Sequence, residues 1–220
     1  ADGVDAQDVV EAAEGDPRTE AHRQLDELAV GVVGVEPGPE VGVDAVGLSG
    51  VDAGLVRANR RPPVQVDGES VDYGFVGDIV SIDPTVIRKE LEAGLMPVVS
   101  PVSADDAGVV LNINADTVAA AIGAALGAEK LILCTGMPGI LERLDDPRSL
   151  VSYTDLAGLK RLEQSGNLAG GMLPKASAIE AAIRGGVRRV HVISYNARDS
   201  VLAEVFTNEG TGTMIVADVK

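Results

Sequence analysis

Aromatic residues are scarce in this chain of 220 residues: they make up 2 % of it, and tryptophan is absent. Hydrophobic residues still account for 45 %, so the core has to be built from Val, Ile, Leu and Ala. A chain of this length can bury a substantial core. Alternating β-branched and alanine-rich segments favour a parallel sheet covered by helices.

Cysteine, histidine and positive charge are also rare. The single cysteine, Cys134, excludes an intrachain disulfide and favours a reducing compartment such as the cytoplasm. The formal net charge of −16 argues against a nucleic-acid or anionic-membrane binder, because both partners need a cationic surface. With only His22 and His191, a catalytic triad or a histidine metal site has little to build on, and we expect no protein metal site.

Several common motifs and long apolar runs are missing as well. No apolar run reaches the ~18 residues of a membrane span, and no signal segment opens the chain. The absence of any Gly-Lys pair excludes a Walker loop. The segment "GLSGV" has Val51 where a nucleophile elbow needs glycine, and no G-x-G-x-x-G follows a strand. A hydride-transfer enzyme is therefore disfavoured.

Strand and helix signals alternate from residue 43 onward. The segment "VDAVGLSG" indicates a buried strand, and Asp67-Gly68 between alternating residues indicates a hairpin. Gly94 is expected to end a helix that has Pro84 at its first position. Three residues are expected to cap or begin helices: Asp83, Thr154 and Asp199. This order predicts a three-layer αβα sandwich with a mainly parallel central sheet.

Lys175 lies in the stretch "SGNLAGGMLPKASAIEAAIRGG", where it follows Gly170 and Gly171 at the start of an expected helix. The start of a helix exposes N–H groups and a partial positive charge. A glycine pair lets an anion approach this backbone closely. Together with a lysine, these features are suited to phosphate oxygens during phosphoryl transfer. The alternative is a pair of capping glycines beside a surface lysine.

A polar cluster, "NINAD", precedes an otherwise apolar helix. It places Asn112, Asn114 and Asp116 within five residues. If the helix begins within this segment, Asn112 and Asp116 share one side of it. The alternative for Asp116 is an ordinary interaction with the helix dipole in the first turn.

Several motifs, taken in order, resemble the acetylglutamate kinases of the amino acid kinase family. The resemblance covers roughly residues 43 to 218. It rests on "VGLSGVDAG", "GFVGDIVSIDP", "NINADTVAAAIGAALGAEKLIL", "GMPGIL", "GGMLPKASAIEAAIRGGVRRVHVIS" and "LAEVFTNEGTGTMIV".

The resemblance implies the amino acid kinase fold and transfer of the γ-phosphoryl group of ATP, with Mg²⁺, to the side-chain carboxylate of N-acetyl-L-glutamate. An N-terminal lobe, residues 1–127, would bind the amino acid and dimerise, and a C-terminal lobe, residues 128–220, would bind ATP. A carboxylate acceptor is already ionised at neutral pH and needs no general base. Catalysis then consists of positioning and charge neutralisation.

The resemblance also assigns roles to residues. Lys175 corresponds to the lysine that stabilises the transition state, and Asp116 to the aspartate that orients the catalytic lysines. Asn112 corresponds to the substrate-binding asparagine, and Arg18 is the candidate for the substrate's α-carboxylate. The implied nucleotide site consists of Thr135, Gly136, Gly139, Leu141, Gly170, Gly171 and Met172.

A regulatory site is implied near the C-terminus. In arginine-inhibited members, a histidine, a glutamate and a glycine contact the effector, and here they correspond to His191, Glu204 and Gly210. An ordinary strand histidine is the alternative for His191. The family also implies a homodimer, or a hexamer built as a trimer of dimers.

The chain departs from the family pattern in three places. The K-x-G-G strand and the H-G-G loop are not found, and Gly136 stands where the family usually has aspartate. Either the two missing motifs lie outside these 220 residues, or the chain is a degenerate, amino-acid-sensing homologue. The related kinase that acts on aminoadipate or glutamate held on an acidic carrier protein is a further alternative, although an acidic surface would repel that carrier.

Overall fold

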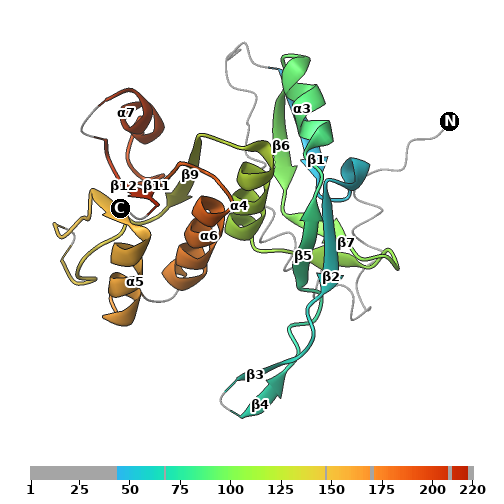
Figure 1. The fold of residues 1–220 in the computed structure, drawn as a ribbon, viewed down its shortest axis with the longest axis horizontal. Helices are drawn as coiled ribbons and strands as arrows, with labels where there is room; N and C mark the ends of the chain where they lie inside the picture. Colours follow the sequence, from blue (N-terminus) through green and yellow to red (C-terminus); the bar gives the residue numbers. More distant parts are fainter. Residues whose placement is uncertain (1–43, 67, 147, 169–170, 208–209, 218–220) are drawn as a thin grey trace, which may run out of the picture. The chain divides into compact units, whose positions relative to one another are not determined.

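The structure is a computed structural model that describes residues 44–66, 68–146, 148–168, 171–207 and 210–217 (Figure 1). These residues form two compact units, divided between Ile113 and Asn114, with residues 82–84 joining the second unit. Helix α4 (Ala115–Leu126) therefore belongs to the second unit. The reason is that α4 contacts α6 (Met172–Arg184) and β9 (Lys130–Thr135).

The first unit contains two sheets and a helix. Strands β1 (Ala45–Ser49) and β6 (Met96–Ser100) pair in parallel. A four-stranded sheet has the order β5-β2-β7-β8. Its strands are β5 (Gly77–Ile82), β2 (Val56–Arg60), β7 (Val102–Ala104) and β8 (Val110–Asn112). Leu55 and Leu111 are completely buried here, whereas β1, which we expected to be buried, is half-exposed in its two-stranded sheet.

A hairpin extends from the first unit (Figure 1). It consists of β3 (Val64–Val66) and β4 (Glu69–Val71), which pair antiparallel. Gly68 has a φ of +87°, which is easily adopted only by glycine. The hairpin predicted here is confirmed, although Asp67 lies outside the described residues. The helix expected after Asp83 is α3 (Thr85–Glu92).

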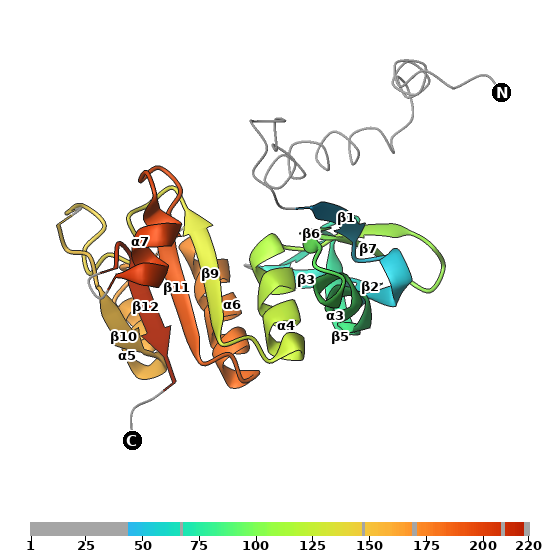
Figure 2. The same cartoon turned by 90° about the horizontal axis from the view of Figure 1, so that it is seen from above.

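The second unit has a four-stranded sheet in the order β10-β12-β11-β9. The strands besides β9 are β10 (Tyr153–Asp155), β12 (Thr213–Val216) and β11 (Arg189–Ser194). All neighbours are parallel except β11 and β12. Helices α5 (Leu156–Gln164) and α6 lie on one face, and α7 (Ser200–Phe206) lies on the other (Figures 1 and 2).

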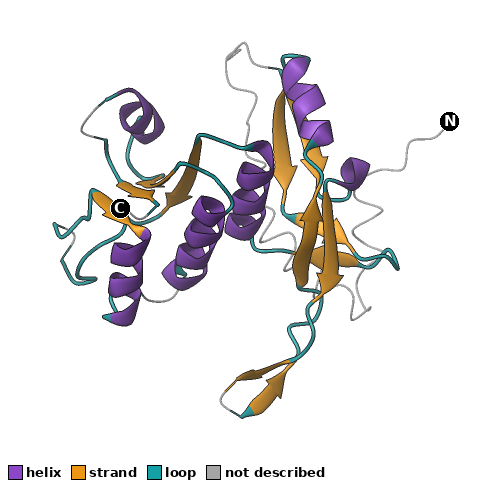
Figure 3. Cartoon of the chain, in the orientation of Figure 1, coloured by secondary structure: helices purple, strands orange, loops and turns teal. Residues whose placement is uncertain are grey.

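The unit is thus built in three layers, with strands and helices alternating along the chain (Figure 3). Its core is aliphatic, as the composition predicts: Ile179, Ala182, Val190, Val192 and Ile215 are completely buried. The expected α/β class with mostly parallel sheets is confirmed.

Small residues allow α4 and α6 to approach closely. Ala120 and Ala182 are buried in one hydrophobic core. A Cβ atom on Gly185, at the end of α6, would lie 2.6 Å from the Cβ atom of Ala124. A larger residue at position 185 would therefore push the two helices apart.

The residues that precede α7 and α5 agree only in part with the expected helix starts. Asp199 immediately precedes α7, as predicted. Thr154 does not cap α5: the cap is Asp155, whose carboxylate accepts a hydrogen bond from the Gly158 N–H at 2.7 Å. Thr154 is instead a buried residue of β10. No helix among the described residues is long and apolar enough to cross a membrane.

Candidate active site

The carboxyl end of the second unit's sheet gathers several of the predicted residues. Helix α4 leads into β9, and α6 leads into β11, so the N-termini of both helices lie at the end where these strands finish (Figure 2). In α/β sheets, ligands bind outside the carboxyl ends of the strands.

Lys175 and Asp116 form a direct ion pair at this end. The Nζ atom of Lys175 lies 2.8 Å from both carboxylate oxygens of Asp116. The lysine side chain is 10 % exposed and the aspartate 24 %. Asp116 occupies the first turn of α4, whose cap is Asn114 through a hydrogen bond from the Thr117 N–H. The pair is thus largely removed from water and held by two helices.

Helix α6 begins at Met172, three residues earlier than Lys175, which lies in its first turns. Pro174 is tolerated there because the first N–H groups of a helix lack intrahelical partners. Gly171, the residue before the helix, has no side chain with which to cap these groups. The first turn of α6 therefore has N–H groups that no side chain of its capping residue satisfies. Gly170 lies outside the described residues.

The loop after β9 carries the other predicted nucleotide residues. Thr135 ends the strand, and Gly136 is exposed. A Cβ atom on Gly139 would lie 2.8 Å from the Thr213 Oγ1 atom, so this approach requires glycine. Leu141 is only 3 % exposed and therefore anchors the loop in the core.

Two residues that the sequence analysis missed hold the same loop. The Tyr195 N–H donates to the Thr135 carbonyl at 3.0 Å. The Asn196 Nδ2 atom donates to the Gly136 carbonyl, also at 3.0 Å. The sequence feature that could have identified these two residues is their position directly after the strand that ends at Ser194.

The three predicted effector residues also come together. The His191 Nδ1 atom lies 2.7 Å from the Glu204 Oε1 atom, and both side chains are buried. The other oxygen, Oε2, accepts the N–H groups of Thr211 at 2.6 Å and Gly212 at 3.1 Å. Gly210, with a φ of +62°, leaves room for this carboxylate. Glu204 thus ties α7 to β11 and to the start of β12.

The environment of Glu204 changes its acidity. Burial alone would raise the pKa of the carboxyl group, because it disfavours the charged form. The hydrogen bonds from the Thr211 N–H, His191 and the Gly212 N–H outweigh burial and hold the pKa below its ordinary value. The carboxylate is therefore ionised at neutral pH.

The two predicted substrate-binding residues, Asn112 and Arg18, are not among the described residues of the second unit. Asn112 belongs to the first unit, where it ends β8 and its N–H donates to the Phe75 carbonyl at 2.8 Å. It is therefore not on α4, which begins at Ala115. Arg18 lies outside the described residues.

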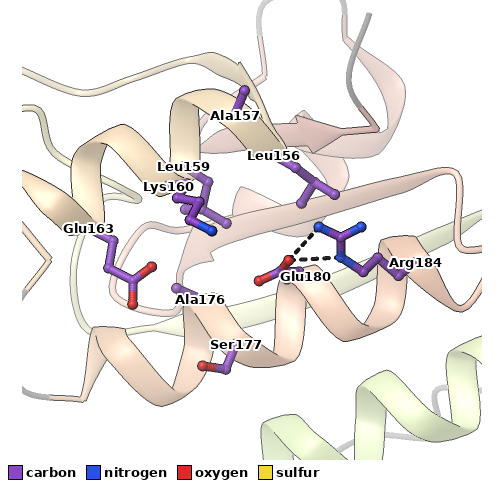
Figure 4. A pocket seen from close by; sticks show the side chains of 9 residues that line it. All are labelled: Leu156, Ala157, Leu159, Lys160, Glu163, Ala176, Ser177, Glu180 and Arg184. Atoms are coloured by element: carbon purple, nitrogen blue, oxygen red, sulfur yellow. Dashed lines mark hydrogen bonds and ion pairs between the residues drawn. The ribbon is translucent and has the colours of Figure 1, made fainter.

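A pocket of about 250 Å³ lies between α5 and α6 (Figure 4). Its lining includes Lys160 and an ion pair between Glu180 and Arg184, with 2.7 Å between the charged atoms. None of the predicted site residues lines it. Among the described residues, no group of three or more His, Cys, Asp or Glu side chains could hold a metal ion.

Comparisons with known proteins agree with the family resemblance that the order of the motifs indicates. A model of the amino acid kinase family matches residues 29–194. The acetylglutamate kinase of Myxococcus xanthus is 50 % identical over 183 residues, covering 80 % of this chain and 59 % of the relative. The chloroplastic acetylglutamate kinase of Arabidopsis thaliana is 44 % identical, covering 79 % of this chain and 48 % of the relative. The chain thus spans less than two thirds of the length of these relatives.

Solved structures show the same fold. N-acetylglutamate synthase from Neisseria gonorrhoeae, complexed with coenzyme A and N-acetyl-glutamate, has a TM-score of 0.68 and 29 % identity. The match covers 81 % of this chain and 39 % of that one. An isopentenyl phosphate kinase structure has a TM-score of 0.54 and 22 % identity, covering 80 % and 60 %.

Proposed function

Since the chain belongs to the amino acid kinase family, we propose that it transfers the γ-phosphoryl group of ATP to the side-chain carboxylate of N-acetyl-L-glutamate. The observation that carries this proposal is the buried pair of Lys175 and Asp116 beside the first turn of α6. The acetylglutamate kinases that match this chain at 44–50 % identity support the choice of acceptor.

The chemistry requires little more than this pair and a bound nucleotide. The acceptor carboxylate attacks the γ-phosphorus, the bond from phosphorus to the β,γ-bridging oxygen breaks, and ADP leaves. No proton has to be removed from the acceptor, because a carboxylate is already ionised at neutral pH. Negative charge spreads over the transferred group in the transition state. A cation placed there accelerates the reaction by stabilising that charge.

In this mechanism Lys175 supplies the cation, and Asp116 keeps it in position. A lysine side chain has four rotatable bonds, and an ion pair to both carboxylate oxygens restricts them. The pair is also shielded from water, so its electrostatic interactions are less screened than on the surface. The N–H groups of the first turn of α6 add a second source of positive potential.

ATP and Mg²⁺ are proposed to bind at the loop after β9 and at the start of α6. The exposed Gly136, Gly171 and the N-terminus of α6 support a phosphate position, because a glycine backbone can approach a phosphate closely. Mg²⁺ would arrive with the nucleotide. We propose that Asn112 and Arg18 bind N-acetyl-L-glutamate, that the enzyme forms a homodimer or a hexamer built as a trimer of dimers, and that it works in the cytoplasm.

A trapping assay tests the proposed reaction. The intact chain is incubated with ATP, Mg²⁺ and N-acetyl-L-glutamate in the presence of hydroxylamine, which converts an acyl phosphate into a hydroxamate. We expect hydroxamate that depends on all three components. The carrier-linked alternative predicts product only with carrier-bound aminoadipate or glutamate, which mass spectrometry distinguishes. No hydroxamate with any of these acceptors would rule out the kinase assignment.

The cluster of His191, Glu204 and Gly210 supports a second candidate, the binding of arginine as an inhibitor or as the ligand of a sensing homologue. N-acetylglutamate synthase from Neisseria gonorrhoeae, which resembles this chain at 26 % identity with a TM-score of 0.69, is known in complex with L-arginine. Calorimetry with L-arginine tests this candidate. Binding without any kinase turnover would favour a sensor, and binding together with turnover would favour a feedback-inhibited enzyme.

A further inference from the structure

Strands β9 and β11 are parallel neighbours, and their partners Thr135 and Ser194 are the last residues of each. Beyond this point the chain diverges. The next helix after β9 is α5, on one face of the sheet, and the next after β11 is α7, on the opposite face (Figures 1 and 2). Thr135 and Ser194 thus mark the carboxyl ends of the two strands, and α/β sheets bind their ligands outside such ends.

Tyr195 is the first residue after β11, at this end of the sheet. The Oη atom of Tyr195 is 2.9 Å, and its Cζ atom 3.4 Å, from the position that a Cβ atom on Gly136 would occupy. The phenol end of the ring therefore lies against the backbone of Gly136, in space that any other residue at position 136 would fill. The residue is nevertheless 68 % exposed. The ring thus combines a contact with the Gly136 backbone with a large surface open to solvent.

Hydrogen bonds on both sides hold this aromatic residue in place. Its own N–H donates to the Thr135 carbonyl. The following residue, Asn196, donates from its side chain to the Gly136 carbonyl and from its N–H to the Ser194 Oγ atom at 3.2 Å. These bonds fix the backbone of Tyr195 and Asn196 against the loop after β9.

We propose that Tyr195 contacts the base of the bound nucleotide and that Asn196 positions it. This inference rests on the proposed ATP-dependent function and adds the residue that recognises the base. Stacking is the interaction that an exposed aromatic ring offers to a nucleobase, and it tolerates any base because each has a π face. The phosphate groups would then extend along the glycine loop toward Lys175.

Comparison of two ligands separates base recognition from phosphate binding. The intact chain is titrated by calorimetry with Mg·ATP and with Mg·tripolyphosphate, which lacks the base. We expect Tyr195→Ala to weaken ATP binding about tenfold, as expected for one lost stack, while tripolyphosphate binding stays within twofold. Tyr195→Phe keeps the ring and should restore ATP affinity to within twofold. Tyr153→Ala, at an exposed tyrosine of the edge strand β10, is the matched control and should change neither ligand.

Tyrosine fluorescence supplies a readout that a purely structural role would not change. The chain has three tyrosines and no tryptophan, so its emission reports on tyrosine directly. ATP, but not tripolyphosphate, should quench part of this emission. The quenching should disappear in Tyr195→Phe although ATP still binds. Asn196→Ala alone should weaken ATP binding severalfold. In a chain that already carries Tyr195→Ala, Asn196→Ala should not weaken ATP binding further.

Three results would overturn this inference, and they are distinguishable. If the native chain binds ATP and Tyr195→Ala binds it equally well, Tyr195 does not recognise the base. If Tyr195→Ala loses tripolyphosphate as well as ATP, the ring only supports the loop. If the native chain binds neither ligand, the proposed kinase function fails together with this inference.

Discussion

The ammonium group of Lys175 lies 2.8 Å from both carboxylate oxygens of Asp116, across 59 positions of the sequence. The pair joins the first turns of α6 to the first turn of α4. Neither residue is needed to fill the apolar core, which consists of aliphatic side chains. A largely buried ion pair is costly to desolvate, so its presence is better explained by a functional role than by stability.

Removing one partner of the Lys175–Asp116 pair should lower the free energy of unfolding more than removing both partners. Asp116→Ala leaves the Lys175 ammonium buried without a counter-charge, and we expect the free energy of unfolding to fall by about 3 kcal/mol. The double variant Asp116→Ala/Lys175→Met should recover most of this loss, because it removes the isolated charge. Urea denaturation measures both values.

The exposed pair of Glu180 and Arg184 is the matched control for this experiment. Its side chains are 47 % and 65 % exposed, and Glu180→Ala should cost less than about 0.5 kcal/mol. An equal loss for Glu180→Ala and Asp116→Ala would show that burial of the Lys175–Asp116 pair has no energetic consequence.

The stability contribution of Glu204 should depend on pH. The pKa of this carboxyl group is held below the ordinary value of 4.5 in the folded protein. The contribution is therefore fully present above pH 4.5 and is lost as the pH falls through the folded-state pKa. The difference in unfolding free energy between the native chain and Glu204→Gln should shrink as the pH falls below about 4.5. A difference that grows as the pH falls below this value would contradict this assignment.

Gly210 should be intolerant of a side chain for two reasons. Its φ is +62°, and a Cβ atom would lie 2.7 Å from the Glu204 Oε2 atom. We expect Gly210→Ala to lower the free energy of unfolding by about 2–3 kcal/mol. Gly166 has a similar φ of +76° but open space around it, so Gly166→Ala should cost only the backbone strain of about 1 kcal/mol. Equal losses in thermal or urea unfolding would mean that the contact with Glu204 is irrelevant.

Local patterns in the sequence predicted most of the elements. The hairpin around Gly68, the helix after Asp199 and the alternation of strands and helices follow from turn residues and periodicity. The residue that caps a helix was harder to predict from the sequence than the helix itself. Thr154 and Asp155 both have side chains that can cap a helix, both belong to β10, and only the structure shows that Asp155 provides the cap.

The site was predictable only in part. The order of the family motifs pointed to Lys175 and Asp116, but no periodicity relates two residues this far apart in sequence. The arrangement of Tyr195 over Gly136 depends on the register of β9 against β11, in which Ser194 pairs with Thr135. That register is a tertiary property, because it depends on which faces of the two strands are buried in the folded unit.

The most direct test of the proposed mechanism is the turnover number of Lys175→Ala in the hydroxamate assay. We expect kcat to fall by at least about 100-fold, as for the loss of one charge stabiliser in a transition state, while circular dichroism shows a folded protein. Lys160→Ala, at a lysine on α5, should keep the native kcat. A folded Lys175→Ala variant with unchanged kcat would contradict the account, because the charge at α6 would then not act on the transferred phosphoryl group.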